Sequence, residues 1–305
     1  MSNKTNTPTG NNAILNSFKT KFATTVNVVH VNSLGIDVKF REVSVTEQKS
    51  LSKIMIENEN RRDIVYDTQC ALINKLCLDD KIPYETVDPE TKEKVVSYKK
   101  FDIYDLTEFD RIRILMEIYQ SNYFHNNIEY VCPVCSQKNS YTLEFDNIIA
   151  KLNQFELKDI TYYLEDKNYK YNFILNYPRV RDVSEFYKQY MKKYRGTNKK
   201  QQEVLDNLGN IDYINLFIKR IELINKNDPN DKQIADLTMM TYSDIEELIS
   251  YFPQNIIFSE ETGVLRYIAK EFIEKINSAF SYEKCQFCGA ETKEGIGSTS
   301  DFFLS

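Results

Sequence analysis

Two short cysteine pairs are the residues of this sequence best suited to chemistry. Cys132-Pro-Val-Cys135 and Cys285-Gln-Phe-Cys288 each place two thiols three positions apart. This spacing is typical of a zinc knuckle, in which a tight turn directs both sulfurs at one metal ion. Gly289, after the second pair, supplies the left-handed backbone conformation that often closes such a turn. Two knuckles provide the four thiolates of a tetrahedral zinc site. We therefore expect Cys132, Cys135, Cys285 and Cys288 to hold one structural zinc ion per chain.

The separation of the two pairs is unusual. Common zinc ribbons space their pairs by roughly 15–20 residues, but 149 residues (136–284) lie between Cys135 and Cys285. One shared zinc ion would close about half of the chain into a loop and would act as a structural clip. The other interpretation is that each pair contributes to an intermolecular site in a dimer. We favour the single intramolecular site, which predicts that the Cys132 and Cys285 sulfurs lie within about 4 Å, and which a separation above about 8 Å would exclude.

No catalytic constellation accompanies the cysteines. The sequence holds two histidines, His30 and His125, and neither has a nucleophile in a recognisable local frame. There is no phosphate-binding loop, no dinucleotide-binding glycine pattern and no HExxH motif. A zinc ion with four cysteine ligands has no open position for water, so it does no hydrolysis. Cys70 and Cys77 lie seven residues apart on a predicted helix, and we interpret both as core cysteines. We expect a protein that is not an enzyme.

Composition further narrows the classes of protein to which this chain can belong. The chain has 305 residues, a hydrophobic fraction of 42%, a net charge of −6 and a pI of about 5.3. The acidic balance argues against general nucleic-acid binding, and we interpret the basic stretch 192–200 as a solvated helix end. Residues 1–12 are polar, and no run of 18 apolar residues occurs. We expect a cytoplasmic product without a membrane partner, in which reduced thiols favour metal over disulfide.

Periodicity and capping signals predict an α+β, mainly helical protein. Ser44 with Glu47, Thr107 with Asp110, and Thr241 with Asp244 have the spacing of helix N-terminal caps. A β-hairpin turning at Gly35 is expected over 27–41, and strands over 129–131 and 141–145 should flank the first cysteine pair. Further strands are expected at 92–98 and 170–175, the former within a loop over 79–100. Helices are expected over 44–58, 61–78, 107–119, 183–194, 211–225, 241–251 and 260–280.

These elements suggest four parts. Residues 1–26 form a flexible arm, 27–130 a strand-hairpin and helical region, and 131–290 a mostly helical region that closes back on the first cysteine pair. Residues 291–305 form a flexible tail that carries Phe302-Phe303-Leu304. The fold class is thus helices with short antiparallel strands and a split zinc ribbon. The apolar end of the tail either folds back onto the body or docks on a partner.

The order of features resembles the baseplate hub and hub-assembly protein family of T-even-type contractile-tail bacteriophages. Four patches carry the resemblance: 38–41 with 46–51; 106–115 with 129–130 and the first cysteine pair; 172–178; and 237–252 with the second cysteine pair, Gly289 and Phe302-Phe303. The stretches 79–98 and 187–210 depart from the family's usual length. The patches cover about a fifth to a quarter of the chain.

The resemblance implies a structural or assembly component at the base of a phage tail. Its expected partners are tail and baseplate proteins, namely the hub, the tape-measure protein or neighbouring baseplate subunits. It would be found in the host cytoplasm during assembly, and in the virion tail baseplate if it stays in the particle. A zinc-ribbon nucleic-acid-binding or transcription-related factor is the alternative, for which the basic stretch 192–200 is the best support.

Overall fold

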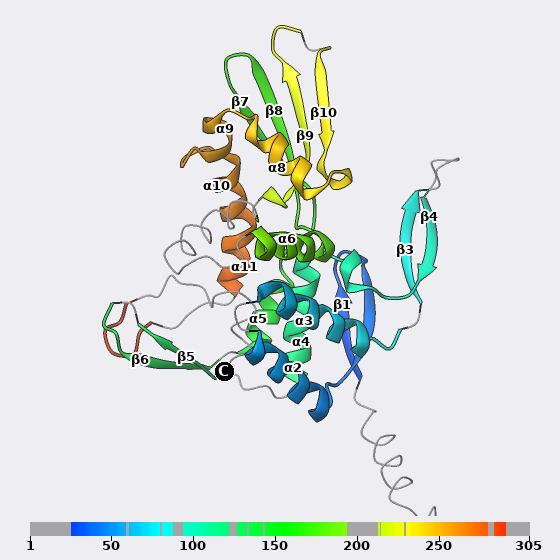
Figure 1. Cartoon of the computed structure of the whole chain (residues 1–305), viewed down its shortest axis with the longest axis vertical. Coiled ribbons are helices and arrows are strands. Elements are labelled where there is room, and N and C mark those ends of the chain that lie inside the picture. Colours follow the sequence, from blue (N-terminus) through cyan, green and yellow to red (C-terminus); the bar gives the residue numbers. More distant parts are fainter. Residues whose placement is uncertain are drawn as a thin grey trace, which may run out of the picture.

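The computed structural model shows a helical body from which a four-stranded sheet and two separate hairpins extend (Figure 1). The expected flexible arm up to residue 25, the tail 291–305, His125 and the basic stretch beyond residue 193 lie outside the described residues. The structure describes residues 26–58, 61–79, 81–87, 94–121, 127–132, 134–142, 144–193, 213, 215–228, 230–279 and 284–290. Within these ranges, no helix is long and apolar enough to cross a membrane.

Helix α4 (Glu108–Ser121) lies at the centre of the body. Its expected cap is present: the Asp110 amide nitrogen contacts the Thr107 hydroxyl at 3.2 Å, and that hydroxyl donates to the Asp110 carboxylate at 2.6 Å. Its apolar residues Phe109, Ile112, Leu115, Met116 and Tyr119, which follow the helical period, are all buried. Around α4 pack α3 (Arg62–Leu76), α5 (Phe145–Leu152), α6 (Val180–Lys193) and strand β1 (Val26–Val31).

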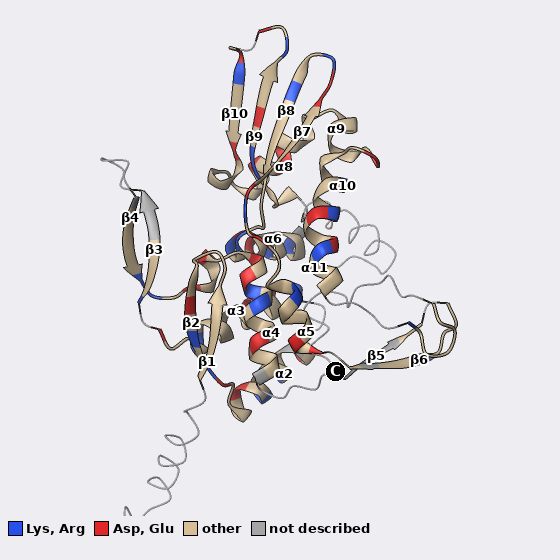
Figure 2. Ribbon diagram, turned by 180° about the vertical axis from the view of Figure 1, so that it is seen from behind, with Lys and Arg blue, Asp and Glu red and all other residues tan. Residues whose placement is uncertain are grey.

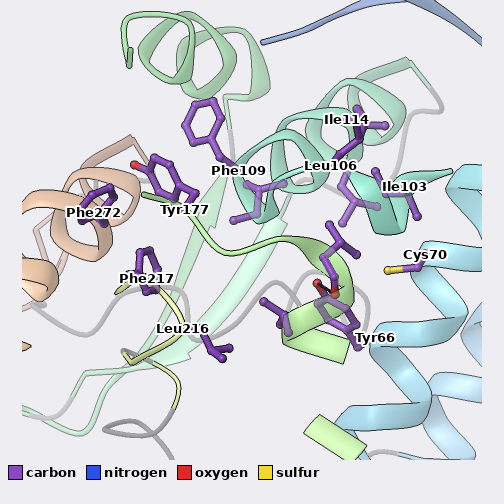
Figure 3. Packing of buried hydrophobic residues seen from close by; sticks show 14 of the residues in the cluster. Tyr66, Cys70, Ile103, Leu106, Phe109, Ile114, Tyr177, Leu216, Phe217 and Phe272 are labelled. Carbon is purple, nitrogen blue, oxygen red and sulfur yellow. Dashed lines mark hydrogen bonds between the residues drawn. The ribbon is translucent and has the colours of Figure 1, made fainter. Parts of the chain in front are cut away.

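A buried ion pair fixes the start of α4. Arg111 is 1% exposed and donates from Nε to the Glu108 carboxylate at 2.8 Å, while its Nη1 donates to Gln69 Oε1 at 2.9 Å. The Tyr66 hydroxyl donates to the same carboxylate, and its ring lies 4.3 Å from the Arg111 guanidinium carbon. The Glu108 amide donates to the Pro178 carbonyl at 2.8 Å. These contacts connect α3, α4 and the segment before α6. They lie at one end of a group of packed buried rings, which we call the aromatic core and which comprises Phe109, Tyr177, Phe217 and Phe272 (Figure 3).

The N-terminal hairpin agrees with the prediction. Strands β1 and β2 (Ile36–Arg41) pair in antiparallel fashion, and Gly35 has a φ of +63° in the turn. Arg113 of α4 donates to the His30 carbonyl and to Asn32 Oδ1, the latter at 2.8 Å, so the hairpin is held against α4. Helix α2 (Val45–Glu57) follows, and its predicted N-terminal cap is present: the Ser44 amide donates to Glu47 Oε2 at 3.0 Å.

A four-stranded antiparallel sheet lies at one end of the molecule, in the order β10-β9-β8-β7 (Figure 1). Strand β8 agrees with the prediction, whereas β7 and β10 were not predicted. Tyr162 of β7 stacks on Tyr267 at a ring distance of 4.0 Å, and Phe252, after α8, contacts Tyr171 and Phe173 of β8. The bounds are β7 Ile160–Glu165, β8 Tyr169–Leu175, β9 Ile218–Asn225, β10 Lys232–Asp236 and α8 Tyr242–Ser250.

The predicted helix over 211–225 is wrong, because residues from Ile218 onward form strand β9. The register between β8 and β9 shifts near Ile174 and Leu175, so that Lys219 is an extra residue on β9. This bulge brings Ile218 and Ile221 to the core although they are three positions apart. Their spacing therefore imitates the period of a helix.

The last helical segment delivers the chain to the second cysteine pair. It comprises α10 (Val264–Ile268), the π-helical turn η3 (Ala269–Ile273) and α11 (Glu274–Ala279), and it begins four residues later than predicted. The ring of Phe272, in the π-helical turn, lies 5.0 Å from that of Tyr177 and 5.3 Å from that of Phe217 (Figure 3). The π-helical turn thus belongs to the aromatic core.

The remaining elements are short. Strands β3 (Ile82–Val87) and β4 (Lys94–Lys99) form a projecting hairpin. The segment 92–98 was expected to be a short strand or one arm of a hairpin, and β4 is such an arm, whereas β3 lies where only a loop was expected. The predicted N-terminal cap of α8, formed by Thr241 together with Asp244, is present. The other elements of the described residues are single turns and one short helix: η1 Ile103–Asp105, η2 Leu237–Met239 and α9 Gln254–Phe258. The fold is therefore a mixed α/β arrangement of helices with short antiparallel sheets.

The buried ion pair gives a first prediction. Glu108→Gln should lower the free energy of unfolding by about 3–5 kcal/mol, because it leaves the Arg111 guanidinium buried without its counter-charge. The double variant Glu108→Leu/Arg111→Met should be less destabilised, since it removes both charges. Urea unfolding checks both, and a double variant as unstable as the single one would contradict the prediction.

A second prediction concerns pH. Hydrogen bonds from Arg41 hold the pKa of the Glu47 carboxyl well below its ordinary value against the opposing effect of burial, and Lys75 adds to the lowering. The ionised carboxylate therefore stabilises the fold above its unfolded pKa of about 4.3, and this contribution is lost as the pH falls. Glu47→Gln should be destabilising at pH 7, with a difference from wild type that shrinks below about pH 4. A difference that stays constant in urea unfolding down to pH 3 would contradict this.

Candidate metal centre

The two cysteine pairs meet at the end of a projecting arm (Figure 1). We call this the cysteine arm; it comprises the hairpin of β5 (Asn127–Val131) and β6 (Lys138–Thr142) together with Lys284–Ala290. The return strand was predicted over 141–145, but it begins at Lys138, and Phe145 already belongs to α5. The difference arises because the turn ends at Ser136, directly after the first cysteine pair.

All four predicted thiols lie in one cluster. The Cys132 and Cys288 sulfurs are 3.7 Å apart, the Cys135 and Cys285 sulfurs are 3.6 Å apart, and every sulfur lies within 4.8 Å of the others. Each close pair joins one cysteine of the first knuckle to one of the second. The distances are too long for a disulfide, whose sulfurs lie about 2.05 Å apart. The cluster can hold a metal ion, and the separation above 8 Å that would exclude a shared site does not occur.

The two knuckles have the same backbone structure. In the first, the Ser136 amide donates to the Cys132 carbonyl at 2.8 Å, and the Cys132 amide donates to the Gln137 carbonyl at 2.9 Å. In the second, the Gly289 amide donates to the Cys285 carbonyl at 2.9 Å, with a second bond from the Cys285 amide to the Ala290 carbonyl. Ser136 and Gly289 occupy equivalent left-handed positions, with φ of 55° and 69°. The pairing of the two knuckles is therefore approximately symmetric.

Asn139 joins the two knuckles and was not identified from the sequence. It is buried, its Oδ1 accepts from the Gln286 amide at 3.0 Å, and its Nδ2 donates to the Gln137 carbonyl at 2.9 Å. The Gln286 side chain donates in turn to the Ser140 carbonyl at 3.3 Å. A lone asparagine on a short strand has no distinctive spacing, so no sequence signal marks this role.

Backbone amides favour ionisation at one of the thiols. Burial by itself raises the pKa of the Cys285 thiol, but the amides of Cys288 and Phe287 donate to its sulfur and bring the pKa down to about 6. The Gln137 amide lowers the pKa of the Cys135 thiol, but burial and the neighbouring thiols outweigh it and raise the pKa to about 12. Cys285 is therefore the better suited of these two thiols to offer a thiolate first.

Helix packing positions the arm. Strand β5 follows α4 in sequence, β6 precedes α5, and the second knuckle follows α11. Helix α5 packs against both α4 and α11. The three stretches of chain that support the cysteine arm therefore start from one group of packed helices, which brings together cysteines that are far apart in sequence.

The other candidate residues do not join this centre. Cys70 is buried in α3, and burial raises the pKa of its thiol to about 12, as expected for an inert core cysteine. Cys77 is half-buried just after α3. His30 is exposed and pairs with Asp37 at 2.8 Å. Within the described part of the chain, the four arm cysteines form the one group of side chains suited to a metal ion.

The end of the arm exposes apolar side chains. Val134 and Phe287 occupy equivalent positions in the two knuckles, each directly before the second cysteine, and they are 70% and 62% exposed. Val131, before the first cysteine, is also exposed. The cluster of sulfurs keeps Val134 and Phe287 on adjoining turns, so their side chains are held outside the core of the protein.

Comparisons with known proteins give no further guidance: no protein-family model, curated protein or solved structure matches this chain.

The role of Asn139 can be tested directly. Asn139→Leu removes the acceptor of the Gln286 amide and the donor to Gln137, so we expect exchange of the Gln286 amide hydrogen to accelerate by about tenfold or more. Ser140→Ala, which changes an exposed neighbouring side chain, is the control and should leave the rate unchanged. Hydrogen exchange followed by mass spectrometry or NMR measures both. An unchanged rate in Asn139→Leu would show that the bridge does not hold the second knuckle.

Proposed function

We propose that the four arm cysteines bind one zinc ion, and that this ion is structural. The separations of the sulfurs carry the proposal. Four sulfurs at about 2.3 Å from a tetrahedral zinc ion lie about 3.8 Å apart, close to the 3.6 and 3.7 Å of the two nearest pairs. Four cysteine ligands leave no open position on zinc, so the ion would join two ends of a long loop and activate no water.

The charge distribution of the arm fits such an ion. A zinc ion with four thiolates carries a net double negative charge. Lys138 and Lys284 are the charged residues of 131–142 and 284–290, and no acidic residue occurs in these two segments. Figure 2 shows the arm with few charged residues. Two lysines close in sequence to the cysteine pairs would offset this charge without adding a competing ligand.

For the protein as a whole, we propose a structural or assembly role at the baseplate of a contractile phage tail, exerted by protein–protein docking. Two observations support it: the resemblance described above, and the exposed Val134 and Phe287 at the end of the arm. A rigid turn that exposes a valine and a phenylalanine is suited to insertion into a pocket of a partner, since exposed apolar clusters mark interaction sites. Hub, tape-measure or neighbouring baseplate proteins are the partners that this proposal requires.

A second candidate function is nucleic-acid binding by the arm. Exposed Phe287 near two lysines favours it, because aromatic rings stack on bases and lysines contact phosphates. The net charge of −6 counts against it. Anisotropy of a labelled single-stranded oligonucleotide separates the two: affinity that falls steeply with salt and is lost in Phe287→Ser would favour nucleic acid.

The zinc proposal predicts about one zinc ion per purified chain. Cys132→Ser and Cys285→Ser should each abolish binding and lower the thermal midpoint by roughly 5 °C or more, because the metal-binding free energy contributes to folding. Cys77→Ser is the control, since this thiol lies outside the cluster and zinc should be retained. Atomic absorption and calorimetry give both values. A wild-type chain without zinc, or a single variant that keeps it fully, would contradict the proposal.

The assembly role is tested by deleting the gene from the phage that encodes it. We expect particles that lack complete baseplates in electron micrographs, with assembly restored by the wild-type gene. Val134→Ser/Phe287→Ser should keep zinc and yet fail to restore assembly, whereas Tyr163→Ser, which removes an equally exposed apolar side chain on the sheet, should restore it. Normal tails without the gene would overturn the assembly role and leave the zinc site unaffected.

A further inference from the structure

Strand β10 forms one edge of the four-stranded sheet (Figure 1). Strand β9 pairs with one side of β10, and no strand of the described residues pairs with its other side. Both views of the molecule show this sheet extending beyond the helical body (Figures 1 and 2). An edge strand of this kind offers backbone hydrogen-bonding groups to another strand.

The backbone groups that β10 directs to its open side can be identified. The Asn225 amide of β9 donates to the Asp231 carbonyl at 3.1 Å, so Asp231 bonds toward β9. Successive residues of an antiparallel strand alternate between bonding to one side and to the other. The N–H and C=O groups of Ile234 and Asp236 therefore point away from β9, toward the open side.

The sequence of β10 is complementary to itself. It reads Lys232-Gln-Ile-Ala-Asp236, with opposite charges at equal distances from Ile234. In an antiparallel pair of two such strands about a two-fold axis at Ile234, each Lys232 lies opposite Asp236 of the other copy. The two Ile234 side chains, each 58% exposed in the single chain, lie opposite one another on the same face. Apolar and oppositely charged pairs directly across two strands stabilise a sheet.

The present contacts of the two charged residues leave room for this pairing. Lys232 contacts Glu222 of β9 at 3.0 Å, and its side chain remains 38% exposed. Its ammonium group has three donors, so it can bond a second carboxylate. Asp236 uses Oδ1 to accept from the amide and hydroxyl of Thr238. Within the described residues no partner of its Oδ2 atom is found.

The other strands lack this combination of an open side and opposite charges. Strands β3, β5, β6 and β7 each contain a single Asp, Glu, Lys or Arg, β1 contains none, and the two charged residues of β4 are lysines. Strand β2 carries both signs, but the Leu78 amide donates to its Lys39 carbonyl at 2.8 Å on the side away from β1. Among the described edge strands, the charges therefore single out β10 and a second copy of β10.

We propose that two copies of this chain associate through their β10 strands, paired in antiparallel fashion about a two-fold axis at Ile234. The Ile234 backbone groups of the two copies bond to each other, and a Lys232–Asp236 pair lies on each side of them. The two sheets then form one continuous sheet. This inference does not depend on the zinc ion or on the phage assignment.

The test follows the association of the full chain by sedimentation velocity. Two short strands form a small interface, so we expect dimers with a dissociation constant on the order of 10 μM. Ile234→Pro removes an N–H group that points to the open side and leaves the bonds to β9 intact. It should raise the dissociation constant at least about tenfold.

Tyr163→Pro is the matched control on the opposite edge of the sheet. The Asp166 amide donates to the Tyr169 carbonyl at 3.0 Å, so by the same alternation the N–H group of Tyr163 points to the open side of β7. Tyr163 is 68% exposed, comparable to Ile234. This variant should dimerise as the wild type does.

A charge exchange gives the second measurement. Lys232→Glu alone and Asp236→Lys alone each place like charges opposite one another at both ends of the paired strands, so each should raise the dissociation constant at least about tenfold. An equimolar mixture of the two variants should form heterodimers with nearly wild-type affinity, because every pair again joins opposite charges. Fluorescent labelling of one variant identifies the heterodimer.

Three outcomes would overturn the proposal. The first is a wild-type chain that stays monomeric up to about 200 μM, well above the expected dissociation constant. The second is a dimer that Ile234→Pro leaves unchanged. The third is a mixture of the two charge variants that associates no more tightly than either variant alone. The mixture remains informative even if Ile234→Pro is unstable, because its two members keep the β10 backbone.

Discussion

The body of this protein depends on one buried guanidinium. Arg111 has its charge compensated by Glu108, its Nη1 satisfied by Gln69 and its face covered by the Tyr66 ring. A buried charge that loses a partner is strongly destabilising, so these contacts disfavour any displacement of α3 relative to α4. The same turn of α4 bonds the Pro178 carbonyl, which fixes where α6 begins. The contacts of its first turn thus fix the orientation of α4. The elements that pack along α4 are positioned by this orientation.

That orientation extends to the cysteine arm. The far end of α4 packs on α5, and α5 packs on α11, so the three chain segments that lead into or out of the arm leave a single packed unit. The body therefore places the two cysteine pairs beside each other before any metal ion is considered. Asn139 and the matched turns at Ser136 and Gly289 complete the alignment with hydrogen bonds alone. A bound ion would secure an arrangement that packing has already prepared, which is the role expected of a clip and not of a nucleus for folding.

Local signals in the sequence predicted local structure well. The caps at Ser44, Thr107 and Thr241 and the turn at Gly35 depend on residues within a few positions of one another, and all are present. The cysteine spacing likewise identified the four residues of the candidate centre. The prediction that failed concerns a segment whose structure depends on residues far away in the sequence. The expected helix over 211–225 is instead strand β9, because β9 pairs with β8 across a bulge. Asn139 matters only because a segment 147 positions away lies against it, as its bond to Gln286 shows.

The long separation between the cysteine pairs has a consequence for synthesis. Cys135 is made 153 residues before Cys288 (135 to 288). At about 5–20 residues per second, the first pair leaves the peptidyl transferase centre roughly 8–30 s before the site can be completed. Throughout that interval it is a two-thiol fragment, able to bind a metal only weakly or to react with another chain. A chain released before Cys285 would carry the first pair and never the second, so the completed cluster is restricted to chains synthesised at least as far as Cys288.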